Sequence, residues 1–117
     1  MDFKKQKPIY LQIADTMCER ILSEEWRQGE RIASVREVAE QLGVNPNTAL
    51  RSFDYLQSAN IIFNRRGVGY FVSDDAKNLA LNLQREYFLS EELPYIVAQM
   101  RVLGLTFDDL RKHGEKA

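Results

Sequence analysis

The chain has 117 residues, of which 44% are hydrophobic and 28% charged, and its formal net charge is −1. This length and composition are typical of one globular domain, or of a small domain with an appendage, that buries a core without disulfides. The single cysteine excludes a disulfide framework, and no apolar run approaches the length of a membrane span. We therefore expect a cytoplasmic protein without a membrane partner.

The first predicted helix opens at Pro8 and continues to about Glu25. Its apolar residues recur with helical period, which predicts a core-facing stripe: Ile9, Ile13, Met17, Ile21 and Leu22. Cys18 lies in the same helix and is interpreted as a small core residue, with a redox-sensing thiol as the alternative. Beyond the turn at Trp26 to Gly29, Arg31-Ile32 is expected to form a short strand that pairs with a later hairpin.

A helix, a tight turn and a second helix are predicted between residues 34 and 59. Ser34 and Glu37 have the spacing of a capping box, which starts the first helix. Gly43 follows the last apolar-periodic residue and tolerates the positive φ at which a helix ends. Asn45-Pro46 then supplies an N-cap and a proline at the first position of the second helix.

The second helix has two distinct faces. Ala49, Phe53 and Leu56 recur at helical spacing and should face the core. Asn47, Thr48 and Arg51 fall on another face, where an arginine suits guanine O6 and N7 and an asparagine suits an adenine edge. Thr48 and free N–H groups of the first turn are suited to a phosphate. The alternative is that these polar residues form a solvated helix face.

A β-hairpin follows directly after the second helix. The residues Ile61-Ile62-Phe63 begin one strand, Arg65 to Gly69 form a glycine-rich turn, and Tyr70-Phe71-Val72 forms the return strand. Two arginines at an exposed hairpin tip contribute little to a fold, but beside a DNA groove they meet phosphates or the minor groove. A basic hairpin after a candidate recognition helix therefore indicates a winged helix that binds DNA.

These residues carry a family resemblance. The run from Glu30 to Thr48, together with Gly67 to Val72, resembles the DNA-binding domain of GntR-family transcriptional regulators, and Asn45 to Thr48 with the short tail resembles the YtrA subfamily. The resemblance implies a homodimer with a helical dimerisation tail. It also implies that six residues fall on positions where the family meets DNA: Arg36, Asn47, Thr48, Arg51, Arg66 and Gly67.

The sequence departs from the family pattern at three positions. Ala33 stands where a proline is common, and this change affects only rigidity. Asn60 replaces the glycine that usually follows the recognition helix, and asparagine also adopts the left-handed conformation. Val68 replaces a frequent basic or polar residue of the wing, which puts a minor-groove contact at that position in question.

The residues after Val72 are predicted to be helical. A helix starts at Ser73-Asp74-Asp75, a second begins between Ser90 and Pro94, and Thr106 with Asp109 caps a last one whose Phe107 and Leu110 should face inward. These apolar helices require a partner surface. A second copy of the chain is favoured because a two-fold dimer spaces two recognition helices one DNA turn apart, and the alternative is a monomer whose tail folds back.

The charge is divided unevenly along the chain. Residues 1–73 contain ten Lys and Arg against nine Asp and Glu, a net charge of +1, and residues 74–117 contain six against eight, a net charge of −2. Attraction to DNA must therefore come from a local patch of Arg36, Arg51, Arg65 and Arg66, with Lys4, Lys5 and Lys7 in the N-terminal arm. An enzyme is not expected, because one histidine and one distant cysteine form no catalytic motif.

The sequence thus predicts a mainly α fold with a small β-hairpin: a winged helix-turn-helix DNA-binding domain at residues 1–73 and a helical dimerisation tail at residues 74–117. We expect a transcription regulator, a repressor that binds a palindromic double-stranded DNA operator as a homodimer, without a cofactor or metal. An effector of unknown identity, if one exists, would bind between tail and winged helix. The alternative function is a winged-helix protein-interaction module. The candidate DNA-contacting residues are Ser34, Arg36, Asn45, Asn47, Thr48, Arg51, Arg65, Arg66 and Gly67.

Overall fold

The computed structural model describes residues 6–117. Helices and strands follow one another in this order: α1 Ile9–Leu22, α2 Val35–Leu42, α3 Pro46–Ser58, β1 Ile62–Arg65, β2 Gly69–Val72, α4 Ala76–Tyr87, the π-helical segment η1 Phe88–Glu92, α5 Leu93–Val102 and α6 Phe107–Gly114. The predicted class, mainly helical with a two-stranded antiparallel hairpin, is confirmed. The chain divides into a compact unit that ends at Leu83 and a second unit, Gln84–Ala117.

Helix α1 supplies one wall of the core of the first unit. Its buried residues are Leu11, Ile13, Ala14, Met17, Cys18 and Ile21, so the predicted stripe is confirmed in its centre. Ile9 is an exception, because it is 59% exposed at the first position of the helix. The helical period continued back to Ile9, but the core does not extend that far, and the prediction that Ile9 faces the core is wrong.

The helix-turn-helix forms with the predicted end signals. Ser34 and Glu37 form a reciprocal capping box at the start of α2, and Gly43 ends that helix at φ +65°. The Asn45 side chain accepts the N–H of Asn47 at 2.8 Å at the start of α3. Asn60 adopts φ +61° after α3, as the departure from glycine at this position predicted.

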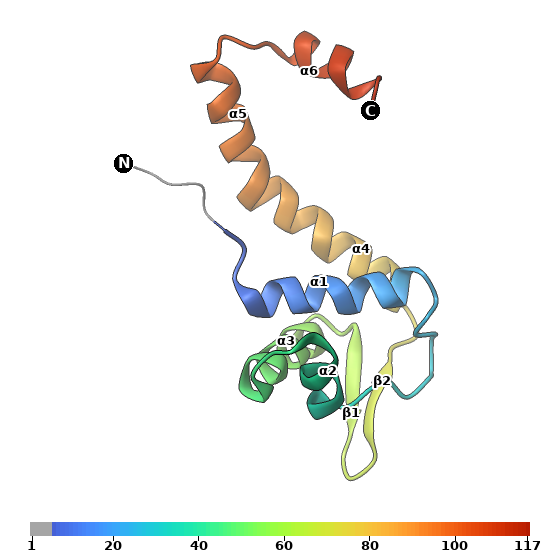
Figure 1. Ribbon diagram of the computed structural model, residues 1–117. Helices are drawn as coiled ribbons and strands as arrows, with labels where there is room; N and C mark the ends of the chain where they lie inside the picture. Colours follow the sequence, from blue (N-terminus) through green and yellow to red (C-terminus); the bar gives the residue numbers. More distant parts are fainter. Residues whose placement is uncertain (1–5) are drawn as a thin grey trace. The chain divides into compact units, whose positions relative to one another are not determined.

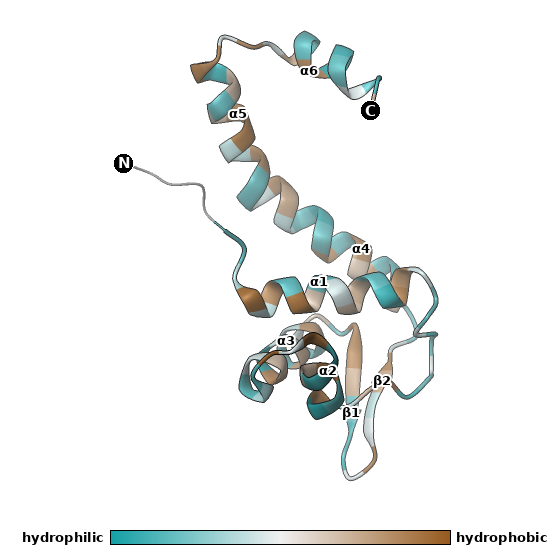
Figure 2. Ribbon diagram, in the orientation of Figure 1, coloured by the Kyte–Doolittle hydropathy of each residue, from teal (hydrophilic) through white to brown (hydrophobic). Residues whose placement is uncertain are grey.

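The hairpin pairs Ile62 with Val72 at its base and Arg65 with Gly69 next to the turn. The predicted third strand is confirmed as a single bridge, between Arg31 and Phe71. Figure 1 shows α2 and α3 on one side of α1, with the hairpin beside them and its turn directed away from α1. Strand β1 is hydrophobic in its first half, near the helices, and hydrophilic toward the turn (Figure 2).

The core of the first unit joins α1, α2, α3, the hairpin and the start of α4. Phe53 and Leu56 of α3 are fully buried with Ile61 before β1, and Ala76 and Ala80 of α4 belong to the same cluster. Because of these two alanines, the compact unit continues beyond residue 73 as far as Leu83. The division of the functions, with DNA binding before residue 74 and dimerisation after it, remains a prediction.

The second unit differs from the sequence expectation in two respects. Helix α5 begins at Leu93, within the predicted window of Ser90 to Pro94, but η1 continues the helical hydrogen bonding from α4 with wider turns, so Pro94 does not interrupt the helix. The predicted capping box of Thr106 and Asp109 does start α6. Phe107 and Leu110, however, are 68% and 47% exposed, so the prediction that they face inward is wrong for this unit of a single chain.

Within the described residues, no helix combines the length and the apolar character that crossing a bilayer requires.

Burial controls the chemistry of Cys18. Its side chain is 1% exposed, and this desolvation, with the nearby Asp15 carboxylate, raises the pKa of the thiol from 9.0 to about 12. The thiolate fraction at pH 8 is therefore about 1000-fold lower than for an exposed thiol. We expect Cys18 to react with a maleimide or aromatic disulfide at least 1000-fold more slowly in the native protein than in urea. Reaction of the native thiol at the rate seen in urea would contradict this environment.

Replacing either of two hairpin glycines by alanine is expected to lower the free energy of unfolding, by a different amount at each position. Gly69 has φ +145°, and a Cβ there would lie 2.8 Å from Nε of Arg31, whereas Gly67 has φ +78° and open space around it. We expect Gly67→Ala to lower the free energy of unfolding by about 1 kcal/mol and Gly69→Ala by about 2 to 3 kcal/mol. Urea unfolding of the two variants measures the difference, and equal costs would show that the Arg31 side chain moves away from the new methyl group without loss of stability.

Candidate nucleic-acid interface

The predicted base-reading residues lie together at the start of α3. A shallow open groove is lined by Pro8, Ile9 and Tyr10 from the start of the chain and by Asn47, Thr48 and Arg51 from α3. Asn47 and Arg51 are exposed, and Thr48 is half-buried. The three polar side chains therefore share one accessible surface, which is the arrangement needed to meet the edges of bases in a groove.

Arg51 is held by an aromatic ring. Its guanidinium carbon lies 3.9 Å from the centroid of the Tyr10 ring. The next residue, Ser52, is fully buried, and its hydroxyl donates to the Tyr10 carbonyl at 2.7 Å. The first turn of α1 is thus fixed against α3 directly beside Arg51. The sequence did not predict this role of Tyr10, because the apolar periodicity of α1 gives no information about a contact with Arg51.

The N–H groups at the start of α3 are not free, contrary to the sequence expectation. Pro46 has no N–H, the N–H of Asn47 donates to the Asn45 side chain at 2.8 Å, and that of Thr48 donates to the Asn45 carbonyl at 3.0 Å. The expectation failed because Asn45 caps the helix more completely than its spacing alone showed. The NH₂ group of Asn45 and the side chain of Asn47 have no hydrogen-bond partner within residues 6–117.

The start of α2 offers backbone donors instead. Ser34 and Glu37 satisfy each other in the capping box, at 3.1 Å in both directions, while the N–H groups of Val35 and Arg36 have no partner in the described chain. Hydrogen bonds from the backbone and the hydroxyl of Ser34 lower the pKa of Glu37, so this carboxylate stays ionised at neutral pH. Ser34 therefore holds this helix start in place, and a direct phosphate contact by Ser34 remains a prediction.

The turn of the hairpin carries the second group of predicted residues. Arg65, Arg66 and Gly67 are all exposed, and the N–H of Val68 closes the turn by donating to the Arg65 carbonyl at 2.9 Å. The guanidinium carbon of Arg65 lies 4.7 Å from the centroid of the Phe71 ring. Arg66 has no such ring contact within the described residues, and its side chain is exposed at the turn.

Five arginines in this part of the first unit form no ion pair within the described residues. Within residues 6–117, the ion pairs engage Lys7, Arg20, Lys77, Arg111 and Lys112, and none engages Arg31, Arg36, Arg51, Arg65 or Arg66. Arg31 was not among the predicted contacts, although it pairs with Phe71 and its guanidinium lies over Gly69. Lys7 is paired with Asp15 at 2.7 Å, and the predicted Lys4 and Lys5 lie outside the described residues.

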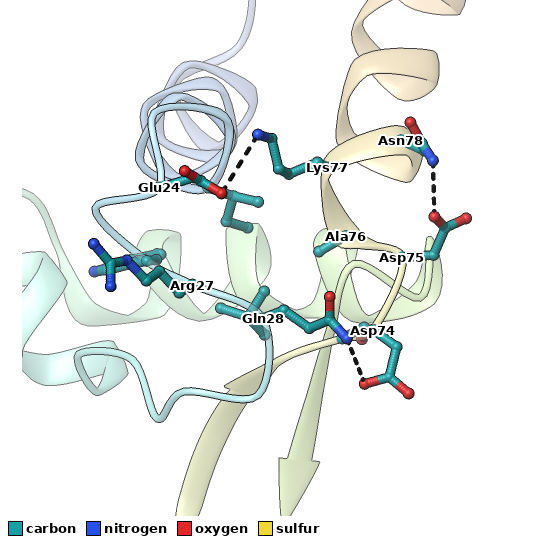
Figure 3. A pocket seen from close by; sticks show the side chains of 12 residues that line it. Glu24, Arg27, Gln28, Asp74, Asp75, Ala76, Lys77 and Asn78 are labelled. Carbon is teal, nitrogen blue, oxygen red and sulfur yellow. Dashed lines mark hydrogen bonds and ion pairs between the residues drawn. The ribbon is translucent and has the colours of Figure 1, made fainter.

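Another pocket of the first unit lies between the end of α1 and the start of α4 (Figure 3). Its polar side chains satisfy one another, since Lys77 pairs with Glu24 at 3.7 Å, Gln28 donates to Asp74 at 3.4 Å, and Asn78 donates to Asp75. These contacts leave few polar groups to bind a ligand. The pocket therefore does not identify an effector.

Comparisons with known proteins identify the family. Residues 9–72 match the family model described as bacterial regulatory proteins, gntR family. YhcF of Bacillus subtilis (strain 168), an uncharacterized HTH-type transcriptional regulator, is 38% identical over 108 residues, which are 92% of this chain and 88% of that protein. The HTH-type transcriptional repressor YtrA from the same organism is 29% identical over 112 residues, 96% of this chain and 85% of YtrA.

A solved structure agrees with these relatives. A GntR family transcriptional regulator from Listeria monocytogenes superposes with a TM-score of 0.75 at 29% identity, covering 98% of this chain and 99% of that one. Proteins of this family are DNA-binding regulators, which confirms the expectation that the chain is not an enzyme. Because the family model matches more than half of its length, the chain belongs to the GntR family of bacterial transcription regulators and is a YtrA-like member with a DNA-binding winged helix-turn-helix.

Proposed function

We propose that this regulator is a repressor that binds a palindromic operator as a homodimer. The observation that carries the proposal is a set of exposed arginines on α2, α3 and the hairpin that form no ion pair within the described residues: Arg36, Arg51, Arg65 and Arg66. Unpaired cations on one unit of a chain whose net charge is −1 supply the local attraction that phosphates require. A regulator that reads the chromosome works in the cytoplasm of a bacterium.

The candidate contacts divide into two roles. Asn47 and Arg51 read base edges, because both side chains are exposed at the start of α3 and carry the donors that suit adenine and guanine. The remaining contacts of the proposal position the protein on the sugar-phosphate backbone: Ser34, Arg36, Asn45, Thr48, Arg65, Arg66 and Gly67. To these we add Arg31 and the N–H groups of Val35 and Arg36, because these groups have no ion-pair or hydrogen-bond partner within the described residues.

Exposed apolar side chains of the second unit support a homodimer. Within Gln84–Ala117, seven large hydrophobic residues are at least 41% exposed in the single chain: Phe88, Leu89, Val102, Leu103, Leu105, Phe107 and Leu110. Such a concentration of apolar surface favours association, and two-fold symmetry would place two copies of α3 on successive half-sites. Repression follows from occupancy of the operator and agrees with the function that the name of YtrA gives to that relative.

The protein-interaction alternative has no observation in its favour. A module of that kind would select no DNA sequence and would show little dependence of binding on salt. Selection from a random duplex library tests the proposal directly. A palindromic consensus supports both sequence recognition and two-fold symmetry, and recovery of unrelated sequences would refute both.

The two arginine groups predict different binding defects. We expect Arg51→Ala to cost about 1 to 3 kcal/mol and to relax base preference at one position in each half-site. Arg66→Ala should weaken all sequences evenly and should lower the slope of log affinity against log salt by about 1 per half-site. Gel shifts with the selected duplex and its single-base variants measure both effects.

Arg27→Ala is the matched control, because it removes the same charge from an exposed position at the other pocket of the same unit. It should retain the affinity and the base preference of the wild type. Unchanged affinity in both Arg51→Ala and Arg66→Ala at moderate salt would show that the contact assignment is wrong.

The dimer proposal predicts that negative charges introduced into the exposed apolar surface of the second unit convert the dimer to monomers. Val102 is 85% exposed and Leu103 69% exposed, so Val102→Glu with Leu103→Glu should fold, while two buried carboxylates per copy would disfavour the interface. Sedimentation velocity should show twice the chain mass for the wild type and the single-chain mass for the variant, with at least about 100-fold weaker operator binding.

Val68→Glu adds one carboxylate at a 46% exposed hydrophobic residue outside the second unit, and this control should remain dimeric. A wild-type protein that sediments as a monomer while it binds the full palindrome would end the dimer proposal.

A further inference from the structure

Three contacts converge on Tyr10 in the first turn of α1. The guanidinium of Arg51 lies over its ring, with the Cζ atom 3.9 Å from the ring centroid. The ring of Tyr55 makes an edge contact with it, at 6.0 Å between centroids and 84° between planes. The Tyr10 carbonyl accepts the hydroxyl of the buried Ser52 at 2.7 Å. Tyr10 is therefore fixed to α3 through the contacts of its ring with Arg51 and Tyr55 and through its backbone carbonyl.

Within the described residues, no hydrogen bond or ion pair engages the guanidinium of Arg51, so its N–H donors are available. A guanidinium is planar and carries its N–H donors around its rim, so a ring against its face restricts its orientation without occupying those donors. No carboxylate of the described residues forms an ion pair with Arg51. An arginine held in this way loses less side-chain freedom when it forms a bidentate contact with guanine.

We propose that Tyr10 is a positioning residue that sets the base preference of Arg51. The inference rests on the proposed function, in which Arg51 reads a base edge. Tyr10 itself contributes the orientation of the guanidinium and no contact with the base. The start of α1, which sequence reasoning treated only as part of the scaffold, thereby takes part in operator discrimination.

Discrimination against a wrong base is the quantity that tests this role. The probe is the duplex selected by the wild-type chain, with variants at the position where Arg51→Ala relaxes preference. Tyr10→Phe keeps the ring and should retain the wild-type ratio of affinities within about 2-fold. Tyr10→Leu removes the aromatic face while keeping an apolar side chain, and it should lower the ratio by about 3-fold to 10-fold.

A double-mutant cycle separates positioning from a general structural effect. In the Arg51→Ala background, Tyr10→Leu should cause no further loss of discrimination, because the residue it orients is absent. A merely structural disturbance would weaken the preferred duplex and its variants alike and leave their ratio unchanged. Tyr10→Met replaces Tyr10→Leu if thermal unfolding shows that the leucine variant does not fold.

The possible failures can be told apart. If Arg51→Ala alters no base preference, the proposed base-reading role of Arg51 is wrong, and with it the premise of this inference. If Arg51→Ala alters the preference and Tyr10→Leu leaves the ratio unchanged, only the positioning role is overturned. An increase in discrimination by Tyr10→Leu would also overturn it, because that result means that the ring holds Arg51 away from the base.

Discussion

The contact between Phe53 and Tyr70 is the constraint on which the DNA-binding surface depends. Phe53 is fully buried on the inner face of α3, and the ring of Tyr70 in β2 meets it with centroids 4.8 Å apart and planes at 62°. An edge contact between aromatic rings has a preferred geometry in addition to its buried area. It therefore fixes the distance between the helix that carries Arg51 and the hairpin that carries Arg66. Within the described residues, no hydrogen bond, ion pair or ring contact joins these two side chains to each other.

Local signals in the sequence were sufficient to predict most of the first unit. The capping box of Ser34 and Glu37, the left-handed Gly43 and the Asn45-Pro46 start each act within about four residues, so their spacing determines the structure. The same reasoning failed where the structure depends on contacts that residue spacing does not reveal. Helical period cannot show that the core ends before Ile9, nor that Asn45 occupies the N–H groups of Asn47 and Thr48 with both its side chain and its carbonyl.

Contacts between residues far apart in the sequence explain which features of the interface the sequence did not predict. Arg31 and Gly69 are 38 positions apart in the sequence, and only the pairing of Arg31 with Phe71 brings them together. Tyr10 and Arg51 meet because Ser52 is buried beneath the first turn of α1. In the second unit, the expectation of an inward Phe107 and Leu110 assumed an interior that a segment of 34 residues does not enclose by itself.

The distribution of ion pairs reconciles DNA binding with an acidic chain. Total charge governs long-range attraction, but within a Debye length of about 8 Å at physiological salt a phosphate experiences mainly the local charges. Several lysines and arginines of the described residues, among them Lys7, Lys77 and Arg111, are paired with carboxylates. The arginines of α2, α3 and the hairpin form no ion pair within the described residues, so a phosphate displaces no paired carboxylate when it binds them. The net charge of −1 thus restrains non-specific attraction while the unpaired arginines retain their full attraction for a phosphate at contact distance.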